Sequence, residues 1–482
     1  MIRPEKTVDP RPEHANNTRR KTKGVMSPMK KYPALLLILT VTSVLALGAC
    51  DEDKKNTNNV NNVNNVNNVN NANNVNNVNN VNNANNQGPC AAPPKEFWNY
   101  DLSVMPPRNV QIAATCYGEG PNVYVYVADD AWEDGTVTET MVANIVSAWE
   151  TATPGNPQAG IFDAVTSVMG LPPDVDSDPH IVVFLTKLGS YNGTNFDGYF
   201  RRENQSPGAT SNFTEMVYVD CEHHAPDSDY LLGVLAHEFQ HMISFAHDPS
   251  EEGWLDEVFS QAAMVLSGYW SDLAAGNIYL TRTGTTPLLV ADSRNFSYGA
   301  GFLFASWLLD QYPHQFFGDL VADLDDGVAS FNDALALYET EGYDLYDLLL
   351  DWAAASLLND PTVGEGRYAY ATLGDQVNSP TPTTGNWDFQ HTANLALSSY
   401  RYYEFDVDAN QEVSFFTAHG DNIRVLAIFR GEGVVQMLPL AIIEGEGRVT
   451  TPEWAGSWTF IVLRASGSGE VAFTVSTPVD PA

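Results

Sequence analysis

Lysine is almost absent from this sequence beyond its first hundred residues, because Lys187 is the only lysine after Lys95. The chain has 24 Lys and Arg residues against 60 Asp and Glu residues, which gives a formal net charge of −36 at pH 7. Nucleic-acid backbones are polyanions, and a surface with this charge repels them. The composition therefore argues against nucleic acid as a partner.

Cysteine is also scarce, and none of the four cysteines forms a CxxC pair. A zinc site built from cysteines is therefore disfavoured. Cys50 has a separate explanation, given below, which leaves three cysteines. A disulfide between two of them, with Cys90–Cys116 favoured, would be typical of an oxidising compartment, although connectivity cannot be read from sequence.

The N-terminal region contains an apolar run at 32–47, which is too short for a comfortable membrane span. It ends in Leu47-Gly48-Ala49-Cys50, the pattern of a lipobox. We therefore expect residues 1–49 to be a leader with a lipoprotein signal peptide, and a lipid on Cys50 to anchor the chain to a bacterial membrane. The predicted location is the cell envelope or cell surface, with release from the cell as a further outcome. An ordinary signal peptide cut near Ala49 is the alternative.

The next segment repeats Asn-Asn-Val and Asn-Asn-Ala triplets between Asn56 and Gln87. Such a polar segment cannot bury enough apolar surface to order itself, so we interpret residues 50–88 as a disordered tether. A Pro/Thr/Gly-rich stretch at 379–385 marks a second boundary. We expect a catalytic domain at 89–378 and an accessory domain at 386–482.

The motif HExxH lies in the apolar segment that runs from Leu231 to Ile243. Residues four apart share one face of a helix, so His237 and His241 can bind one metal ion, with Glu238 beside it. A second predicted helix follows at 253–266 and offers Glu257 near its start. Two histidines and a glutamate on two helices are the ligands of a catalytic Zn²⁺ site that keeps an open position.

At these residues the chain resembles the hyicolysin-type zinc metallopeptidases of the gluzincin group. The shared pattern is AHEFQHMI at 236–243 followed by WLDE at 254–257, with further matches at 162–163, 197–200 and 211–220. The resemblance covers roughly residues 120 to 355, and Val258 departs from it because the family tends to have glycine there. It implies a zincin-like fold, and it implies that an edge strand at Glu215–Asp220 pairs with the substrate backbone.

Other residues compete for roles in this site. His247 stands where metzincins have their third histidine, but Ser244 replaces the glycine that allows the turn, so Glu257 is preferred as third ligand. Asp256 is the next alternative, and otherwise a helix-start acid or a partner of a ligand. Tyr298 is a candidate donor to the oxyanion, and Tyr269 is equally available.

From about Thr392 the pattern changes to short alternating strands, which predict a small β-sandwich. The expected fold class is thus α+β, with a zincin-like domain followed by a β-sandwich. The expected function is zinc-dependent hydrolysis of peptide bonds in protein or peptide substrates, with Glu238 as general base. The alternatives are a metzincin-like peptidase that uses His247, a zinc hydrolase with other substrates, and an inactive surface-tethered binding protein.

Overall fold

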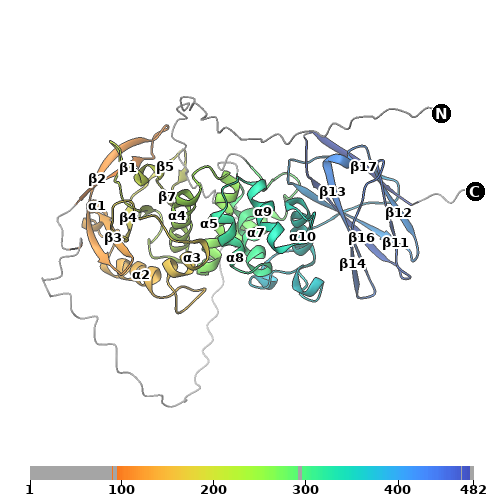
Figure 1. Cartoon of the computed structure of the whole chain (residues 1–482), viewed down its shortest axis with the longest axis horizontal. Coiled ribbons are helices and arrows are strands. Elements are labelled where there is room, and N and C mark those ends of the chain that lie inside the picture. The colour runs from red at the N-terminus through yellow and green to blue at the C-terminus, as the bar shows by residue number, and fades with distance from the viewer. Residues whose placement is uncertain (1–89, 91–94, 291–295, 468, 478–482) are drawn as a thin grey trace, which may run out of the picture. The chain divides into compact units, whose positions relative to one another are not determined.

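The computed structural model describes residue 90 and residues 95–290, 296–467 and 469–477. The predicted leader, the lipid site at Cys50 and the Asn-rich tether lie outside these residues. Within the described ranges, no helix combines the length and the apolar character needed to cross a membrane. Helices and several sheets occur together, which confirms the α+β class (Figure 1).

A six-stranded sheet begins the described chain, in the order β1-β2-β3-β4-β8-β7. Strands β3, β4 and β8 are parallel to one another, and every residue of each is buried, as their largely apolar sequences predict. Strand β7 pairs antiparallel with β8 and lies at the edge. The strands are β1 (Lys95–Asp101), β2 (Arg108–Glu119), β3 (Val123–Ala128), β4 (Ile181–Thr186), β7 (Gly198–Phe200) and β8 (Met216–Asp220).

The edge position differs from the one expected. We predicted an edge strand at Glu215–Asp220, but β8 is flanked by β4 on one side and β7 on the other. That prediction is wrong, because the chain before β8 turns back as β7 and pairs with the side of β8 that faces away from β4. The free edge belongs instead to the three residues of β7.

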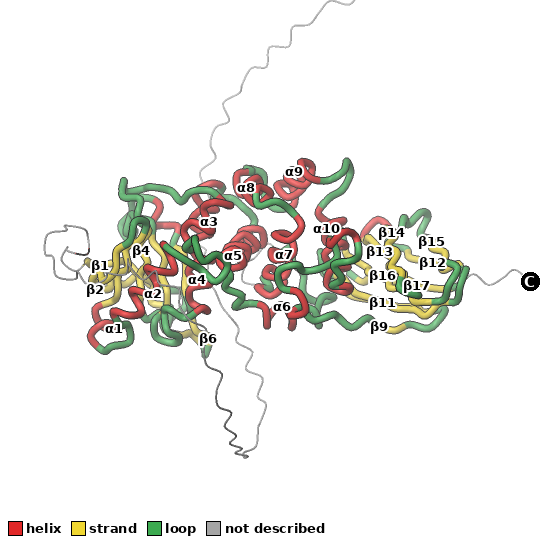
Figure 2. Tube along the Cα trace, turned by 90° about the horizontal axis from the view of Figure 1, so that it is seen from below, coloured by secondary structure: helices red, strands yellow, loops and turns green. Residues whose placement is uncertain are grey.

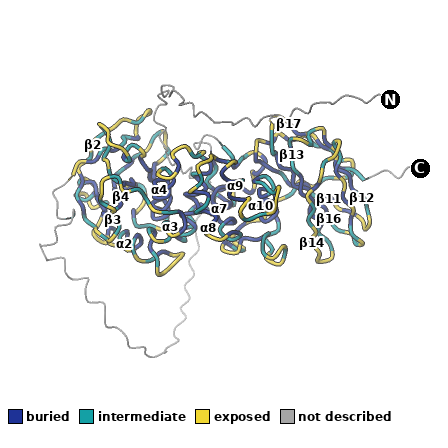
Figure 3. Tube along the Cα trace, in the orientation of Figure 1, coloured by how far each residue is buried: buried dark blue, intermediate teal, exposed yellow. Residues whose placement is uncertain are grey.

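Helices follow the sheet and form the layer that carries the HExxH motif. Helix α4 packs against β7 and β8. It also packs against α5, and α5 packs against α7 (Figure 2). Most residues of α4, α5 and α7 are buried, as the dark segments of α4 and α7 in Figure 3 show. The helices are α1 (Asp129–Glu133), α2 (Glu139–Glu150), α3 (Ile161–Met169), α4 (Asp229–His247), α5 (Gly253–Ser267), α6 (Leu273–Tyr279), α7 (Tyr298–Gln311), α8 (Gln315–Ala322), α9 (Val328–Tyr338) and α10 (Leu345–Leu358).

The C-terminal part consists of two packed sheets, as predicted. A four-stranded sheet has the order β10-β17-β12-β15 and a five-stranded sheet the order β14-β13-β16-β11-β9. Inward side chains of both sheets, such as Phe415 and Phe460, share one apolar core. The strands are β9 (Thr383–Thr384), β10 (Phe389–Asn394), β11 (Tyr400–Val407), β12 (Glu412–Thr417), β13 (Ile423–Gly431), β14 (Val434–Pro439), β15 (Glu446–Thr450), β16 (Gly456–Arg464) and β17 (Glu470–Ser476).

Helix α10 lies against the other face of the five-stranded sheet. The hydroxyl of Tyr402 donates to the carbonyl oxygen of Ala353 at 2.9 Å, and Arg424 forms ion pairs with Asp344 and Asp347. Strand β9 lies within the predicted linker and pairs with β11. The linker therefore contributes to the sandwich.

Cys90 and Cys116 form a disulfide, the pairing favoured from the sequence. Cys221 is a free, buried thiol. Val258, the departure from the family pattern, lies inside α5 and is fully buried.

Candidate metal centre

Helix α4 brings the two histidines of the motif together. Its first turn is capped by Ser228, whose side chain accepts a hydrogen bond from the backbone N–H of Leu231. The helix then continues without interruption to His247, so that His237 and His241 lie one turn apart on the same face. Both side chains are about 1% exposed.

Helix α5 supplies the third group. It begins at Gly253 and ends at Gly268, whose φ of +78° allows the left-handed conformation that terminates the helix. Glu257 is in the second turn and is 1% exposed. Because α5 packs directly against α4, the Glu257 carboxylate reaches the two imidazoles.

The three side chains converge on one point. The Nε2 atoms of His237 and His241 are 3.1 Å apart, and Glu257 Oε2 lies 3.3 Å from the first and 3.8 Å from the second. One ligand atom from each residue lies within 4.8 Å of the others, so the group can hold a metal ion. Glu257 Oε2 is buried without a hydrogen-bond partner. A buried carboxylate oxygen of this kind destabilises the fold unless a bound cation interacts with it.

Glu238 lies next to this group and is held by the edge strand. Its Oε2 atom accepts the backbone N–H of Phe200 at 2.7 Å, whereas Oε1 is buried without a partner. The carbonyl of Asp197 accepts a hydrogen bond from the N–H of Asp220 and therefore points toward β8. Successive residues of a strand direct their backbone groups to opposite sides, so those of Gly198 and Phe200 point to the free edge of β7. The free edge and the glutamate of the motif therefore meet at one place.

His241 is oriented from behind by two residues of α5. Asp256 Oδ2 and Ser260 Oγ lie 3.0 Å and 3.1 Å from its Nδ1 atom. A carboxylate on the outer nitrogen fixes the tautomer that leaves the inner nitrogen free to bind a metal. Asp256 thus has the role of a partner to a ligand, one of the three roles considered from the sequence.

Burial acts in opposite directions on the acids and bases of the group. It lowers the pKa of His237 to about 3 and raises the pKa of Glu257 to about 8. It also raises the pKa of Glu238. His237 is therefore neutral near pH 7, and neutral imidazole is the form that binds metals.

The two tyrosine candidates are separated by the structure. The hydroxyl of Tyr298, at the start of α7, lies 3.5 Å from Glu257 Oε1, and its ring is 6.0 Å from that of His237. Tyr269 instead packs beside Gly233, one helical turn before His237, and the carboxylate that acts on it is that of Asp229 at the start of α4. Only Tyr298 of the two belongs to the site.

His247 does not join the metal group. The helix continues through Ser244, which keeps His247 about 9 Å farther along the axis than His241. The His247 side chain is exposed and faces Gly170. The prediction that preferred Glu257 over His247 therefore agrees with the placement of both residues.

Two residues near His237 were not singled out from the sequence. Gln261 Nε2 lies 3.5 Å from His237 Nδ1 and donates to Asp272 Oδ2 at 2.9 Å. Gln261 follows Glu257 by one helical turn, which is the signal that could have identified it. Asp272 gave no signal, because only the fold brings the start of α6 to this place.

Two further groups of possible metal ligands and a polar cavity lie away from this centre. In the group Asp220, Glu222 and His223, both oxygens of Asp220 already accept backbone N–H groups, and the group Asp323, Asp325 and Asp333 has no buried member.

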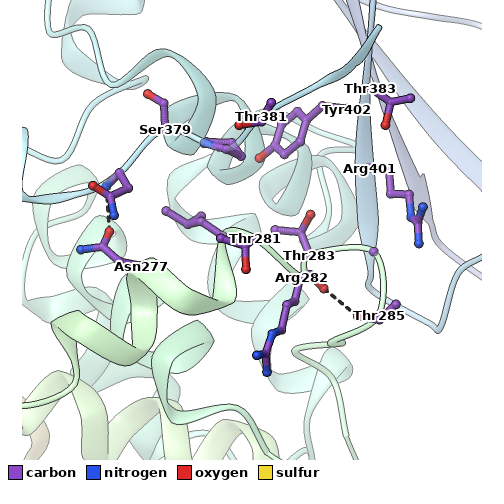
Figure 4. Close-up of a pocket in the computed structure, with 14 residues that line it drawn as sticks. Asn277, Thr281, Arg282, Thr283, Thr285, Ser379, Thr381, Thr383, Arg401 and Tyr402 are labelled. Atoms are coloured by element: carbon purple, nitrogen blue, oxygen red, sulfur yellow. Dashed lines mark hydrogen bonds between the residues drawn. The ribbon is translucent and has the colours of Figure 1, made fainter. Parts of the chain in front are cut away.

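A polar cavity of about 610 Å³ lies between α6, the linker and β11, with Thr281, Thr381 and Tyr402 in its lining (Figure 4). None of the metal-binding candidates lines this cavity.

Comparison with known proteins yields little. No protein-family model matches the chain, and no curated protein matches it in sequence. A mutant periplasmic inhibitor of g-type lysozyme from Escherichia coli is 13% identical, with 20% of this chain and 100% of that chain covered and a TM-score of 0.17. The pre-peptidase C-terminal domain of a collagenase from Bacillus anthracis is 12% identical, with 21% and 99% covered and a TM-score of 0.17. A GH115 4-O-methyl-α-glucuronidase is 7% identical, with 64% and 53% covered and a TM-score of 0.14. At such TM-scores these likenesses carry no argument about function.

Proposed function

We propose that this chain is a zinc-dependent endopeptidase with a zincin-like catalytic domain of the hyicolysin type. The observation that carries the proposal is the convergence of His237, His241 and Glu257 beside Glu238, whose Oε1 atom has no partner. Two imidazoles and one carboxylate are the donor set of catalytic zinc sites, whereas structural sites prefer cysteine. Zinc in this place supplies Lewis acidity, which activates water and polarises a carbonyl group.

The protein groups around that position have complementary roles. Glu238 takes the proton of the attacking water on Oε1, while the N–H of Phe200 holds Oε2 in place. The protonated carboxyl then delivers the proton to the nitrogen of the leaving amine. The hydroxyl of Tyr298 donates to the oxygen on which negative charge develops.

The free edge of β7 supports a peptide as substrate. An extended chain that pairs with the outward N–H and C=O groups of Gly198 and with the C=O group of Phe200 would run directly past Glu238, which already accepts the N–H of Phe200. Backbone pairing of this kind recognises any extended peptide, which fits an endopeptidase. The role that the sequence led us to expect for Glu215–Asp220 is therefore assigned to β7.

We infer a bacterial cell surface as the location of this activity from the N-terminal sequence. A lipid on Cys50 would anchor the chain to the membrane, and residues 50–88 would hold the catalytic domain away from it. The β-sandwich would serve as an accessory domain. Partners are then protein or peptide substrates and the membrane, and not nucleic acid.

The test is metal content together with hydrolysis of casein by the full-length protein. We expect one zinc ion per chain, and loss of hydrolysis with a chelator that is reversed by added zinc. Casein turnover without zinc would contradict the proposal. Zinc binding with turnover of esters or simple amides alone would point to a different hydrolase, and zinc binding without any turnover to a binding protein.

A further inference from the structure

His237 has a buried hydrogen-bonding chain behind it. Gln261 lies between His237 and Asp272, with its Nε2 atom 3.5 Å from the Nδ1 of the histidine and 2.9 Å from the Oδ2 of the aspartate. Gln261 is 1% exposed and Asp272 is 8% exposed. The chain connects three elements, since these residues belong to α4, α5 and the start of α6.

The side chain of Asp272 is not used where its position suggests. Asp272 is the N-cap residue of α6, a place where aspartate normally accepts a backbone N–H of the first turn. Here the side chain makes no such capping bond and is directed at Gln261 instead. Asp272 therefore contacts Gln261, the residue behind His237, and does not cap α6.

The tautomer of His237 determines which hydrogen bonds Gln261 and Asp272 must make. Its Nε2 atom faces His241 and Glu257, so a metal ion would take the lone pair of Nε2 and leave the proton on Nδ1. That N–H needs an acceptor, and the acceptor on Gln261 is Oε1, which is buried without a partner. Rotating the amide by 180° exchanges its nitrogen and oxygen and brings Oε1 to both neighbours. The residue at position 272 must then donate a hydrogen bond.

We propose that Asp272 is a positioning residue for the metal centre, which acts through Gln261 to fix the tautomer and the orientation of His237. This inference rests on the proposed metal-dependent function. It assigns to Gln261 and Asp272 together the role that Asp256 has for His241.

The surroundings of Asp272 lower the free-energy cost of its protonated, donating form. Burial raises the pKa of Asp272 to about 6, although the N–H of Gln261 lowers it, and Glu257 raises it further. The other ionisable groups that face it are Tyr230 of α4 and Tyr298 of α7. A carboxyl group in this environment can hold a proton at little cost when the amide presents its oxygen.

The experiment compares zinc affinities of full-length variants by competition with a chromophoric chelator. Asp272→Asn retains a donor, so we expect it to bind zinc within about threefold of the parent. Asp272→Leu and Gln261→Leu each break the hydrogen-bonded connection behind His237, and the expected loss of zinc affinity is about 10–100-fold. The double variant should be no weaker than the weaker single variant, because both changes break the same chain.

A second readout addresses the tautomer directly. In zinc-loaded protein with ¹⁵N-labelled histidine, the parent and Asp272→Asn should show a slowly exchanging proton on Nδ1 of His237, and Asp272→Leu a rapidly exchanging one. Asp310→Asn, which removes a carboxylate near the far end of α7, is the control and should match the parent. Parent-like affinity in Asp272→Leu, equal losses in Asp272→Asn and Asp272→Leu, or additive losses in the double variant would overturn the proposal. Such results with a zinc-binding, active parent would leave the proposed function intact, whereas a parent that binds no zinc would remove both.

Discussion

The Oδ2 atom of Asp256 lies 3.0 Å from the Nδ1 atom of His241, on the opposite side of the ring from the nitrogen that faces Glu257. The two acids are sequence neighbours on α5, yet one contacts the outer nitrogen and the other contacts the inner one. This works because successive residues of a helix point about 100° apart, so their carboxylates can reach both sides of a ring lying across the helix. One short sequence, Asp256-Glu257, thus provides a ligand and the support for another ligand.

We predict that Asp256→Ala weakens zinc binding by about 10–100-fold, because His241 loses the acceptor that fixes its tautomer. The measurement is chelator competition at constant pH. Asp163→Ala is the matched control, since Asp163 is likewise an acid in the first turn of a helix, α3, but is exposed. Equal zinc affinity in the two variants would show that Asp256 contributes only to the helix terminus.

Glu238→Gln should abolish peptide hydrolysis while zinc content and fold are kept. Glutamine can still accept the N–H of Phe200, so the position of the side chain is preserved while its basicity is lost. We expect a fall of several powers of ten in kcat, because base and nucleophile act as a unit. Parent-like casein turnover in this variant would rule out Glu238 as the general base.

Much of the metal centre could be predicted from the sequence because its information is local. The four-residue spacing of His237 and His241 and the apolar stripe behind them define the ligand face of α4. Glu257 and Asp256 belong to the next helix, so only the packing of two consecutive helices had to be assumed. The pairing of Cys90 with Cys116 was also favoured from the sequence, and these two residues are 26 positions apart in the chain.

The rest depends on long-range pairing that no short pattern encodes. Strand β7 has only three residues, too few for a period-two signal, and its place at the edge follows from its antiparallel pairing with β8. Asp272 comes to His237 only because α6 begins beside α5. In the sandwich, β10, β14 and β15 lie at the edges of the two sheets, and most of their residues are exposed or half-buried, so their apolar signal in the sequence is weak.

Tyr298→Phe should lower kcat by about 10²-fold or more, with little change in KM or zinc content, if its hydroxyl stabilises charge that develops only in the transition state. Steady-state kinetics on a fluorogenic peptide measure this. Tyr269→Phe is the matched control, because that residue packs near Gly233 and away from the ligands. A loss of the same size in both variants would indicate a general effect of removing a buried hydroxyl.

Gly198→Ala should impair both stability and activity. A Cβ atom at Gly198 would lie 2.6 Å from Val234 Cγ1 and 3.4 Å from Glu238 Cγ, so β7 must move away from α4. Overpacking of this kind costs about 1–3 kcal/mol of unfolding free energy, and the shift disturbs the contact between Phe200 and Glu238. Gly208→Ala, where the nearest atom is Ser211 Cβ at 3.5 Å, should be neutral in denaturant unfolding and in turnover.

Glu251 is expected to make the stability of the protein depend on pH. Burial raises its pKa from the ordinary 4.5 to about 7, although the N–H groups of Gly327 and Glu252 lower it, and Asp248 and Asp256 raise it further. The folded state therefore binds the proton more tightly than the unfolded state, and the free energy of unfolding falls as pH rises from about 4.5 to about 7.

Glu251→Gln cannot ionise, yet its amide oxygen can still accept the N–H of Gly327. At pH 8 the variant should be more stable than the parent by about 1–2 kcal/mol, a value reduced for partial exposure, and at pH 4.5 the two should be equal. Denaturant unfolding at both pH values provides the measurement, with the exposed Glu341→Gln as control. A difference between parent and Glu251→Gln that stays constant from pH 4.5 to pH 8 would mean that Glu251 has the same pKa in the folded and the unfolded state.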